Sequence, residues 1–266
     1  MYIKKALIKF INSFFKIFNI GITSYSKLES YKELKNDIKL INKRLKKVDR
    51  VKFNTYVKDS KAQLYQDLVV LTELNFKQGG YFVEFGATNG IDLSNTYLLE
   101  KKLFWDGILA EPAKCWQEEL KRNRKCNIET DCVWKDSNST ISFNQVEIAE
   151  LSTINTFSNS DNNYKLRENG KNYNVNTISL LDLLIKYNAP KTIDYLSIDT
   201  EGSEYDILRN FDFSKYQFNI ISCEHNYSSD RENIYKLLTS KGYVRKYSSI
   251  SKWDDWYFRK DLNNNL

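Results

Sequence analysis

Acidic side chains stand at or next to the ends of the segments that read as β-strands. In an open α/β sheet the carboxyl ends of parallel strands meet along one edge, and ligands bind beyond that edge. Carboxylates gathered there can accept hydrogen bonds from hydroxyl groups, take up protons as general bases or hold a divalent cation. We therefore expect a binding and catalytic site at this edge. Its candidate residues are Glu84, Glu111, Asp131, Asp199, Glu201, Glu224 and the single histidine, His225.

His225 directly follows Glu224 and is a candidate general base. Histidine titrates near neutral pH, so it can exchange a proton with a substrate under working conditions. A lone histidine is more often structural, however, and a neighbouring carboxylate could take the proton instead. The sequence leaves both assignments open.

The stretch from Gly79 to Pro112 organises this edge, because five of the nine glycines of the 266-residue chain fall within it. Tyr81–Phe85 is a short apolar run with one acid, which predicts a buried parallel strand. Glu84–Gly90 forms a glycine-rich loop whose backbone can approach a ligand closely. A helix over Leu93–Leu103 and a second strand over Gly107–Glu111 complete a βαβ unit. Such a unit binds a nucleoside, with the terminal acid accepting the ribose hydroxyls. A purely structural βαβ unit is the alternative.

The rest of the chain continues the alternation of helices and strands. This alternation predicts an α/β fold with a doubly wound, mostly parallel sheet that ends in an antiparallel hairpin. The segment 150–178 holds eight asparagines and is expected to be a functional lid or a disordered loop. Helices are expected at 63–75, 114–124, 178–187, 205–210 and 233–240, and strands at 127–134, 139–143, 193–198, 218–223, 243–249 and 255–259.

Charge divides the chain into two parts. Residues 1–52 carry 14 Lys/Arg and 4 Asp/Glu, a net charge of +10. The remaining residues carry 26 Lys/Arg and 30 Asp/Glu, a net charge of −4. We expect a basic helical extension over residues 1–54 and a catalytic domain over residues 55–266. The four cysteines show no metal-binding spacing, which predicts free thiols in a reducing compartment. No uncharged apolar run is long enough to span a membrane and no cleavage site follows residue 22, so a cytoplasmic protein is expected.

The basic extension contains two patterns of helical periodicity. Residues 1–22 predict a basic amphipathic helix, which either lies on an anionic membrane at its inner face or packs on the domain or a partner subunit. Residues 31–48 follow a short heptad-like pattern that predicts a spacer or a homo-oligomer contact. The lysines there lack interleaved aromatics and a recognisable reading motif, so no nucleic-acid partner is expected.

Several motifs, taken in order, resemble those of the FkbM-type family of class I S-adenosylmethionine-dependent methyltransferases. The resemblance covers roughly residues 60–260 and leaves residues 1–55 outside it. It implies a seven-stranded, Rossmann-like fold and methyl transfer to oxygen, often on sugars of surface polysaccharides or glycolipids, or on polyketides. The motifs are residues 81–96, 107–112, 177–184, 193–204 and 254–258.

The resemblance also assigns roles to particular residues. Glu84, Gly86, Ala87, Asn89 and Gly90 would hold the methionine part of S-adenosylmethionine, Glu111 its ribose, and Asp131 with Cys132 its adenine, while Ser94, Asn95 and Asp199 complete the pocket. Asp199, Glu201, Glu224 and His225 would face the acceptor.

The acceptor hydroxyl must lose its proton as the methyl group is transferred. His225 or a carboxylate of the acidic set can take it as a general base. A metal ion held by Asp199, Glu201 and Glu224 could instead lower the pKa of the hydroxyl, and hard carboxylate oxygens suit Mg²⁺. The sequence does not choose between these routes.

Two other classes of function compete with an O-methyltransferase that acts on a glycan, glycolipid or small-molecule hydroxyl. A nicotinamide-dependent enzyme acting on a nucleotide sugar would normally show GxGxxG, whereas the loop here reads GATNG. A membrane-associated scaffold with a degenerate pocket would not need the full set of strand-end residues. Nucleic-acid methylation would want a basic catalytic domain, and residues 53–266 are net negative.

Overall fold

The computed structural model describes residues 35–43 and 47–262. The chain forms two compact units, Met1–Lys46 and Lys47–Leu266, and the described part of the first unit is a helix over residues 35–43. The expected helix over residues 1–22 lies outside the described residues, as does much of the heptad-like segment. The second unit begins with α3 (Lys47–Tyr56), which runs across the predicted domain boundary at residue 55. None of the described helices is long and apolar enough to cross a membrane.

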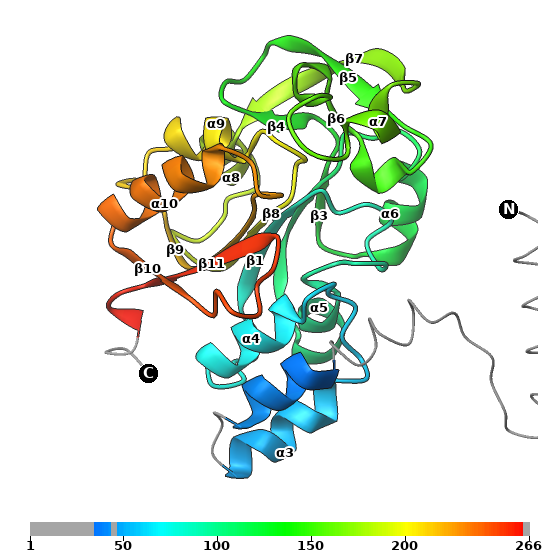
Figure 1. The fold of residues 1–266 in the computed structure, drawn as a ribbon. Helices are drawn as coiled ribbons and strands as arrows, with labels where there is room; N and C mark the ends of the chain where they lie inside the picture. The colour runs from blue at the N-terminus through cyan, green and yellow to red at the C-terminus, as the bar shows by residue number, and fades with distance from the viewer. Residues whose placement is uncertain (1–34, 44–46, 263–266) are drawn as a thin grey trace, which may run out of the picture. The chain divides into compact units, whose positions relative to one another are not determined.

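A seven-stranded sheet in the order β10-β11-β9-β8-β1-β2-β3 forms the centre of the second unit (Figure 1). Neighbours from β9 to β3 pair in parallel, and β11 pairs antiparallel with β9 and β10. The predicted doubly wound, mostly parallel sheet with a terminal hairpin is therefore confirmed. The strands are β1 (Tyr81–Phe85), β2 (Asp106–Ala110), β3 (Asn127–Glu129), β8 (Thr192–Ile198), β9 (Gln217–Glu224), β10 (Tyr243–Lys246) and β11 (Asp254–Arg259).

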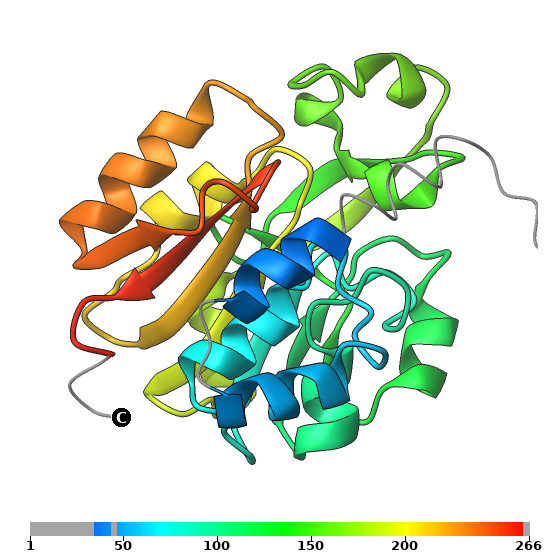
Figure 2. The same ribbon diagram turned by 60° about the horizontal axis from the view of Figure 1, so that its bottom comes forward.

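Helices cover both faces of this sheet (Figures 1 and 2). Alternate side chains of β1 point to opposite faces. Val83 and Phe85 pack in the hydrophobic core formed with α8, α9 and α10, whereas Glu84 lies on the other face. The ribbon views place α4 and α5 on that other face. The helices are α4 (Gln66–Glu73), α5 (Tyr97–Leu103), α6 (Gln117–Asn123), α8 (Leu180–Lys186), α9 (Glu204–Arg209) and α10 (Asp230–Ser240).

A second sheet, in the order β4-β7-β5-β6, lies at the top of the molecule in Figure 1. The single strand expected over residues 127–134 is wrong, because the chain leaves the large sheet after β3 and β4 pairs with β7 instead. The four strands are β4 (Cys132–Trp134), β5 (Thr140–Gln145), β6 (Thr153–Ile154) and β7 (Lys171–Ser179).

The expectation of a lid or disordered loop over residues 150–178 is also wrong for its last part, residues 171–178, which belong to β7. In this strand Tyr173, Val175 and Thr177 alternate with exposed asparagines, and the strand pairs along its length with β5. The asparagines occupy the solvent side of a strand whose other side is covered. The part before β7 contains the short helices η2 (Ala149–Leu151), η3 (Asn155–Phe157) and α7 (Tyr164–Arg167).

Glu84 shapes the glycine-rich loop that follows β1. Its carboxylate accepts hydrogen bonds from the Ser94 hydroxyl at 3.0 Å, from the Asn95 backbone N–H at 2.7 Å and from the Thr96 hydroxyl. These bonds hold residues 91–96 against the end of β1, so α5 begins at Tyr97 and not at Leu93 as expected.

Arg124, which follows α6, holds the same loop from the other side. Its guanidinium is fully buried, donates to the Gly90 carbonyl at 3.1 Å and pairs with the Glu100 carboxylate at 2.5 Å. It also lies 3.9 Å from the Glu84 carboxylate. Burial alone would raise the pKa of Glu100, but Arg124, together with hydrogen bonds from Lys101 and from the Lys125 N–H, lowers it to about 2. Arg124 is thus the cation on which two buried carboxylates depend.

Replacing Arg124 with methionine would leave Glu84 and Glu100 without this cation. Removing one partner of a buried ion pair costs about 3–5 kcal/mol, so we expect the free energy of unfolding in urea to fall by about that amount. Arg122→Met is the matched control, because the Arg122 side chain is 74% exposed and its pairing with Glu119 is a surface contact. An Arg124→Met protein as stable as Arg122→Met would contradict this role.

Candidate functional site

A large pocket opens at the carboxyl ends of the central strands. It encloses about 1240 Å³ of empty space, a figure that includes open solvent at its mouth. Eight of the residues predicted from the sequence line it: Glu84, Gly86, Asn95, Glu111, Cys132, Asp199, Glu201 and Glu224.

Other predicted residues lie behind the pocket wall. Asn89 accepts hydrogen bonds from the Ile91 and Asp92 backbone N–H groups, and Ser94 bonds to Glu84, so both shape the loop. Asp131 lies in the turn between β3 and β4, where its N–H donates to Glu129. Ala87, Asn89, Gly90, Ser94 and Asp131 are not among the described residues that line the pocket.

Glu111 directly follows β2 and is 4% exposed. One carboxylate oxygen accepts from the Thr88 N–H at 2.8 Å, and the other accepts from the Ala113 N–H at 2.8 Å. Each carboxylate oxygen has a second lone pair, so two further donors can bind. Burial raises the pKa of Glu111 to about 7, although both backbone bonds lower it. Two hydroxyls of a ribose would supply the missing donors.

Gly86 allows the loops after β1 and β8 to touch. Its φ is +72°, and a Cβ at this position would lie 2.0 Å from the carbonyl oxygen of Asp199. Only glycine tolerates both this conformation and this approach. The two loops therefore meet inside the pocket, with Asp199 beside the glycine-rich loop.

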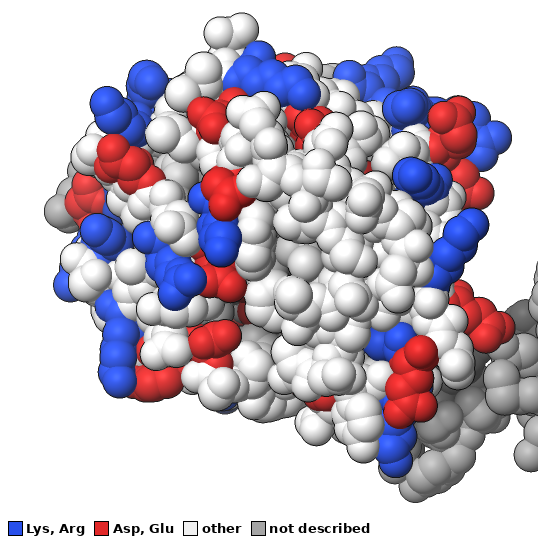
Figure 3. All heavy atoms as spheres, turned by 90° about the horizontal axis from the view of Figure 1, so that it is seen from above, with Lys and Arg blue, Asp and Glu red and all other residues white. Residues whose placement is uncertain are grey.

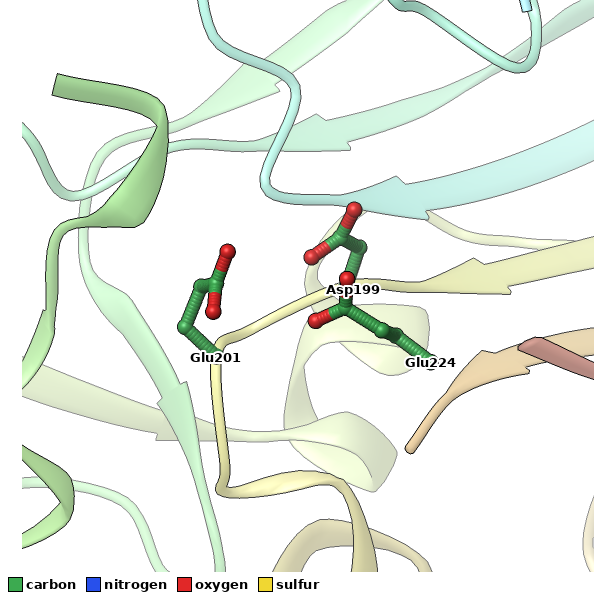
Figure 4. A group of neighbouring side chains, drawn as sticks. All are labelled: Asp199, Glu201 and Glu224. Atoms are coloured by element: carbon green, nitrogen blue, oxygen red, sulfur yellow. The ribbon is translucent and has the colours of Figure 1, made fainter. Parts of the chain in front are cut away.

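Asp199, Glu201 and Glu224, here called the carboxylate cluster, point toward one another from the ends of β8 and β9 (Figure 4). One oxygen from each lies within 4.8 Å of the others. Burial and the charge of Asp254 raise the pKa of Asp199 to about 7. Burial and the charge of Asp199 raise the pKa of Glu201 to about 9, although the charge of Arg167 lowers it. Burial and the charge of Asp199 also raise the pKa of Glu224 well above its usual range. Without a cation or a proton, three such charges cannot share this space.

The loop carrying Glu201 is held from several sides. Glu201 itself has a φ of +59°, a conformation that is strained for a residue other than glycine. The Thr153 hydroxyl donates to its carbonyl at 2.9 Å, and buried Arg167 donates to its carboxylate at 2.5 Å. The Glu204 carboxylate accepts from the N–H groups of Thr200 and Gly202. The second sheet and its short helices thus fix one member of the cluster.

His225 does not line the large pocket. It lines a smaller adjoining cavity that shares Glu224 and Asn226 with it. Its Nδ1 accepts from the Tyr227 N–H at 3.0 Å, and its Nε2 lies 3.9 Å from Asp255. Burial lowers the pKa of His225, although Asp255 opposes this effect. The structure therefore brings together the expected carboxylates but places the expected histidine to one side.

The pocket is lined by acids, and the arginines beside two of them, Arg124 near Glu84 and Arg167 near Glu201, do not line it. Among the described lining residues there are seven acids and no lysine or arginine. Buried negative charge of this kind attracts cations and repels phosphates. The acids are Glu84, Asp92, Glu111, Glu150, Asp199, Glu201 and Glu224.

The sequence profile of the methyltransferase FkbM domain matches residues 84–256, which span the glycine-rich loop, the second sheet and the start of the terminal hairpin. The match covers well over half of the 266 residues. The chain belongs to the FkbM methyltransferase family. It is accordingly an S-adenosylmethionine-dependent methyltransferase, as the resemblance in the sequence predicted.

Solved structures resemble this FkbM-type chain at low identity. A methyltransferase FkbM from Methylobacillus flagellatus aligns with a TM-score of 0.41 and 12% identity, over 77% of this chain and 57% of its own. A precorrin-6y C5,15-methyltransferase from Geobacter metallireducens aligns with a TM-score of 0.38 and 10% identity, over 73% of this chain and 87% of its own. A TehB-like methyltransferase from Corynebacterium glutamicum aligns with a TM-score of 0.37 and 7% identity, over 79% of this chain and 94% of its own. No curated protein sequence matches the chain. The assignment to the family therefore rests on the family profile.

Sequence reasoning missed residues of the FkbM-type pocket that come from distant segments. Asn226 and Trp253 line the pocket, and Arg167 and Thr153 hold Glu201. Asn226 follows His225 directly, so its place at a strand end was a usable signal. Trp253, Arg167 and Thr153 carry no local signal, because their roles depend on contacts between segments far apart in the chain.

We expect the Glu111→Gln variant to bind S-adenosylhomocysteine about 10- to 100-fold more weakly, since hydrogen bonds to a charged group contribute about 1.5–3 kcal/mol. Isothermal titration calorimetry measures this. Glu118→Gln is the matched control, because the Glu118 side chain is 87% exposed on α6. Ribose hydroxyls donate to the ionised carboxylate, whose pKa is about 7 in the free protein. Wild-type affinity should therefore rise between pH 6 and pH 8, and an equal rise in Glu111→Gln would contradict the assignment.

Proposed function

We propose that the protein transfers a methyl group from S-adenosylmethionine to a hydroxyl of a neutral sugar, in a cell-surface polysaccharide or glycolipid intermediate. The observation that carries this proposal is the composition of the pocket. It combines Glu111, whose carboxylate can accept two further donors, with the carboxylate cluster and with uncharged polar groups.

The charge of the pocket supports a cationic methyl donor. S-adenosylmethionine carries a sulfonium, which the ionised carboxylates among the lining acids attract. A nicotinamide cofactor or a nucleotide sugar would bring a pyrophosphate into the same space with no lysine or arginine lining it in the described chain. The nicotinamide-dependent alternative is disfavoured for this reason, and so is a nucleic-acid acceptor.

Beside the carboxylate cluster, the pocket also offers uncharged polar groups to an acceptor. Ser152, Asn163 and Asn226 line it with a hydroxyl and two amides, and Gln63 holds the indole N–H of Trp253 at 3.0 Å. Amide and hydroxyl groups match the hydrogen-bonding edge of a sugar, and a partly exposed indole offers its ring a flat apolar surface. Seen from above, the face near the second sheet has a broad uncharged area with charged residues around its edge (Figure 3). A neutral sugar fits this lining better than an anion.

Most of the catalysis can come from alignment. The displacement requires the acceptor oxygen, the methyl carbon and the sulfur to lie in line, and the meeting of the Gly86 and Asp199 loops fixes where that line can run. The acceptor proton then passes to the carboxylate cluster. Two routes use the same three side chains: a carboxylate acting as general base, or Mg²⁺ held by all three.

The reaction is tested by incubating the protein with methyl-labelled S-adenosylmethionine and separate panels of neutral oligosaccharides, lipid-linked sugars and nucleotide sugars. We expect labelled methyl ethers, stable to mild base and identified by mass spectrometry of the released monosaccharides, from the neutral and lipid-linked panels. Label found only in base-labile esters or on nitrogen would contradict O-methylation. Label only in nucleotide sugars would contradict the charge argument.

We expect Asp199→Asn to lower kcat by at least about 100-fold, the lower range of the contribution of a positioned proton acceptor. S-adenosylhomocysteine affinity should change less than kcat, because Glu111 and the glycine-rich loop remain. Asp206→Asn serves as control, since Asp206 lies outside the pocket on α9 and pairs with Arg209. If both variants keep wild-type kcat, the cluster has no part in proton transfer.

A further inference from the structure

We infer that Asp199, Glu201 and Glu224 form a binding site for one hard divalent cation, Mg²⁺ or Mn²⁺. The site is defined by its own geometry, and only its use in activating the acceptor hydroxyl rests on the proposed function. All three side chains line the large pocket, so the cation would be reached by the acceptor.

The spacing of the three carboxylates suits a single small ion. One oxygen from each lies within 4.8 Å of the other two. Oxygens bound to the same Mg²⁺ at about 2.0–2.1 Å lie roughly 3 to 4 Å apart, so rotation of the side chains by a small amount closes the site. Three protein oxygens would leave positions for water and for an acceptor oxygen, as in sites that act on a substrate. A ligand set made only of carboxylates, with no thiolate or imidazole, favours hard cations such as Mg²⁺ and Mn²⁺.

An unpartnered buried oxygen points into this space. Glu224 is 6% exposed, and its Oε2 has no hydrogen-bond donor among the residues that the structure describes. In Figure 4 its carboxylate lies beside that of Asp199. A buried carboxylate oxygen without a donor is costly, because it has lost its water and gained no partner. A cation between the three side chains would remove this cost.

Buried Arg167, which pairs with Glu201, does not fill this need. Arg167 donates to the Leu151 carbonyl, to both oxygens of Asp161 and to Oε2 of Glu201. Its charge is therefore shared between Asp161 and one member of the cluster. The Asn226 amide also donates to Oε2 of Glu201, at 3.2 Å, and no residue that the structure describes donates to Oε1 of Glu201. The cluster thus keeps carboxylate oxygens without a cation on its pocket side.

Neighbouring contacts hold the site in place before any ion binds. Thr153 and Arg167 fix Glu201 from the second sheet and its short helices, and Glu204 fixes the loop between Asp199 and Ser203. A cation held there would lower the pKa of an alcohol brought to it, which is the step that methyl transfer to oxygen requires. The contacts of Arg167 and Thr153 therefore make them positioning residues for this site.

The test is a titration of the chelator-treated full-length protein with Mn²⁺, followed by the loss of the electron paramagnetic resonance signal of free Mn²⁺. We expect one site, competition by Mg²⁺, and affinity at least about tenfold weaker in Asp199→Asn and in Glu224→Gln. Mn²⁺ should also raise the Tm of the wild-type protein by mass action and raise that of the variants less. Circular dichroism and S-adenosylhomocysteine titration confirm that each variant is folded.

Asp254→Asn is the matched control. Asp254 is a buried acid close enough to raise the pKa of Asp199, but it lies outside the cluster, and its Oδ2 accepts from Gln66 and Trp256. An asparagine keeps an acceptor there while removing the charge. We expect Asp254→Asn to weaken Mn²⁺ binding less than either cluster variant does. An equal loss in all three would show that the pocket attracts Mn²⁺ by charge alone and would overturn the site.

The outcomes separate this inference from the proposed function. A folded protein that binds S-adenosylhomocysteine but binds no Mn²⁺ at millimolar concentration overturns the cation site and leaves methyl transfer standing. Mn²⁺ bound at one site that the cluster variants abolish supports the site even if every sugar panel fails. Methyl transfer unchanged by chelator, together with Mn²⁺ binding, would keep the site and remove its role in activating the hydroxyl.

Discussion

The crowding of carboxylates at the carboxyl ends of the parallel strands is the constraint on which the rest of this structure depends. Glu84, Glu111 and Glu224 are each at least nine-tenths buried, and Asp67 and Asp254 lie buried beside them. Few cations balance them from within the fold. Each carboxylate must therefore take hydrogen bonds from the chain around it, and the loops adopt the shapes that supply these bonds.

The loops of the pocket follow from this requirement. Residues 91–96 turn back on β1 because Glu84 needs the donors they carry, and Arg124 closes that loop from behind. The loop after β8 is held by Glu204, whose carboxylate accepts from its backbone N–H groups. The second sheet is coupled to the pocket in the same way, because Arg167 pairs with Glu201. The insertion after β3 is thus a wall of the site and not an independent appendage.

The sequence predicted the strand-end acids well because each follows an apolar run whose length and composition indicate a buried strand. Glu84, Glu111, Asp199 and Glu224 all line the pocket for this reason. The sequence predicted the strands less well where the residue types of a loop and the pattern of a strand occurred in the same segment. The alternation in β7 was hidden by its asparagines, and the turn at Asp131 between two short strands looked like one continuous strand.

Long-range partners could not be predicted at all. Arg124 looks like an ordinary helix-terminal arginine in the sequence, and Arg167 lies in the segment expected to be a lid or a disordered loop. Only the fold brings each of them to a buried acid. His225 shows how a local signal can differ from the placement in the fold. Its neighbours in the sequence suggested a catalytic base, but residue 225 comes one position after the last residue of β9, and its ring turns into the adjoining cavity beside Asp255.

The same crowding of carboxylates lowers the stability of the empty protein at neutral pH and favours the binding of cations. Burial raises the pKa of Asp67 and of Glu111 to about 7 and that of Asp254 to about 6, so the folded protein holds protons that the unfolded chain has released. Such groups stabilise the fold fully below their unfolded pKa values, near 4, and this stability is lost as the pH rises to about 7. At neutral pH the empty pocket is therefore under electrostatic strain. A sulfonium cofactor or a divalent cation entering it relieves that strain, so the charges that weaken the empty protein strengthen the binding of its positively charged ligands.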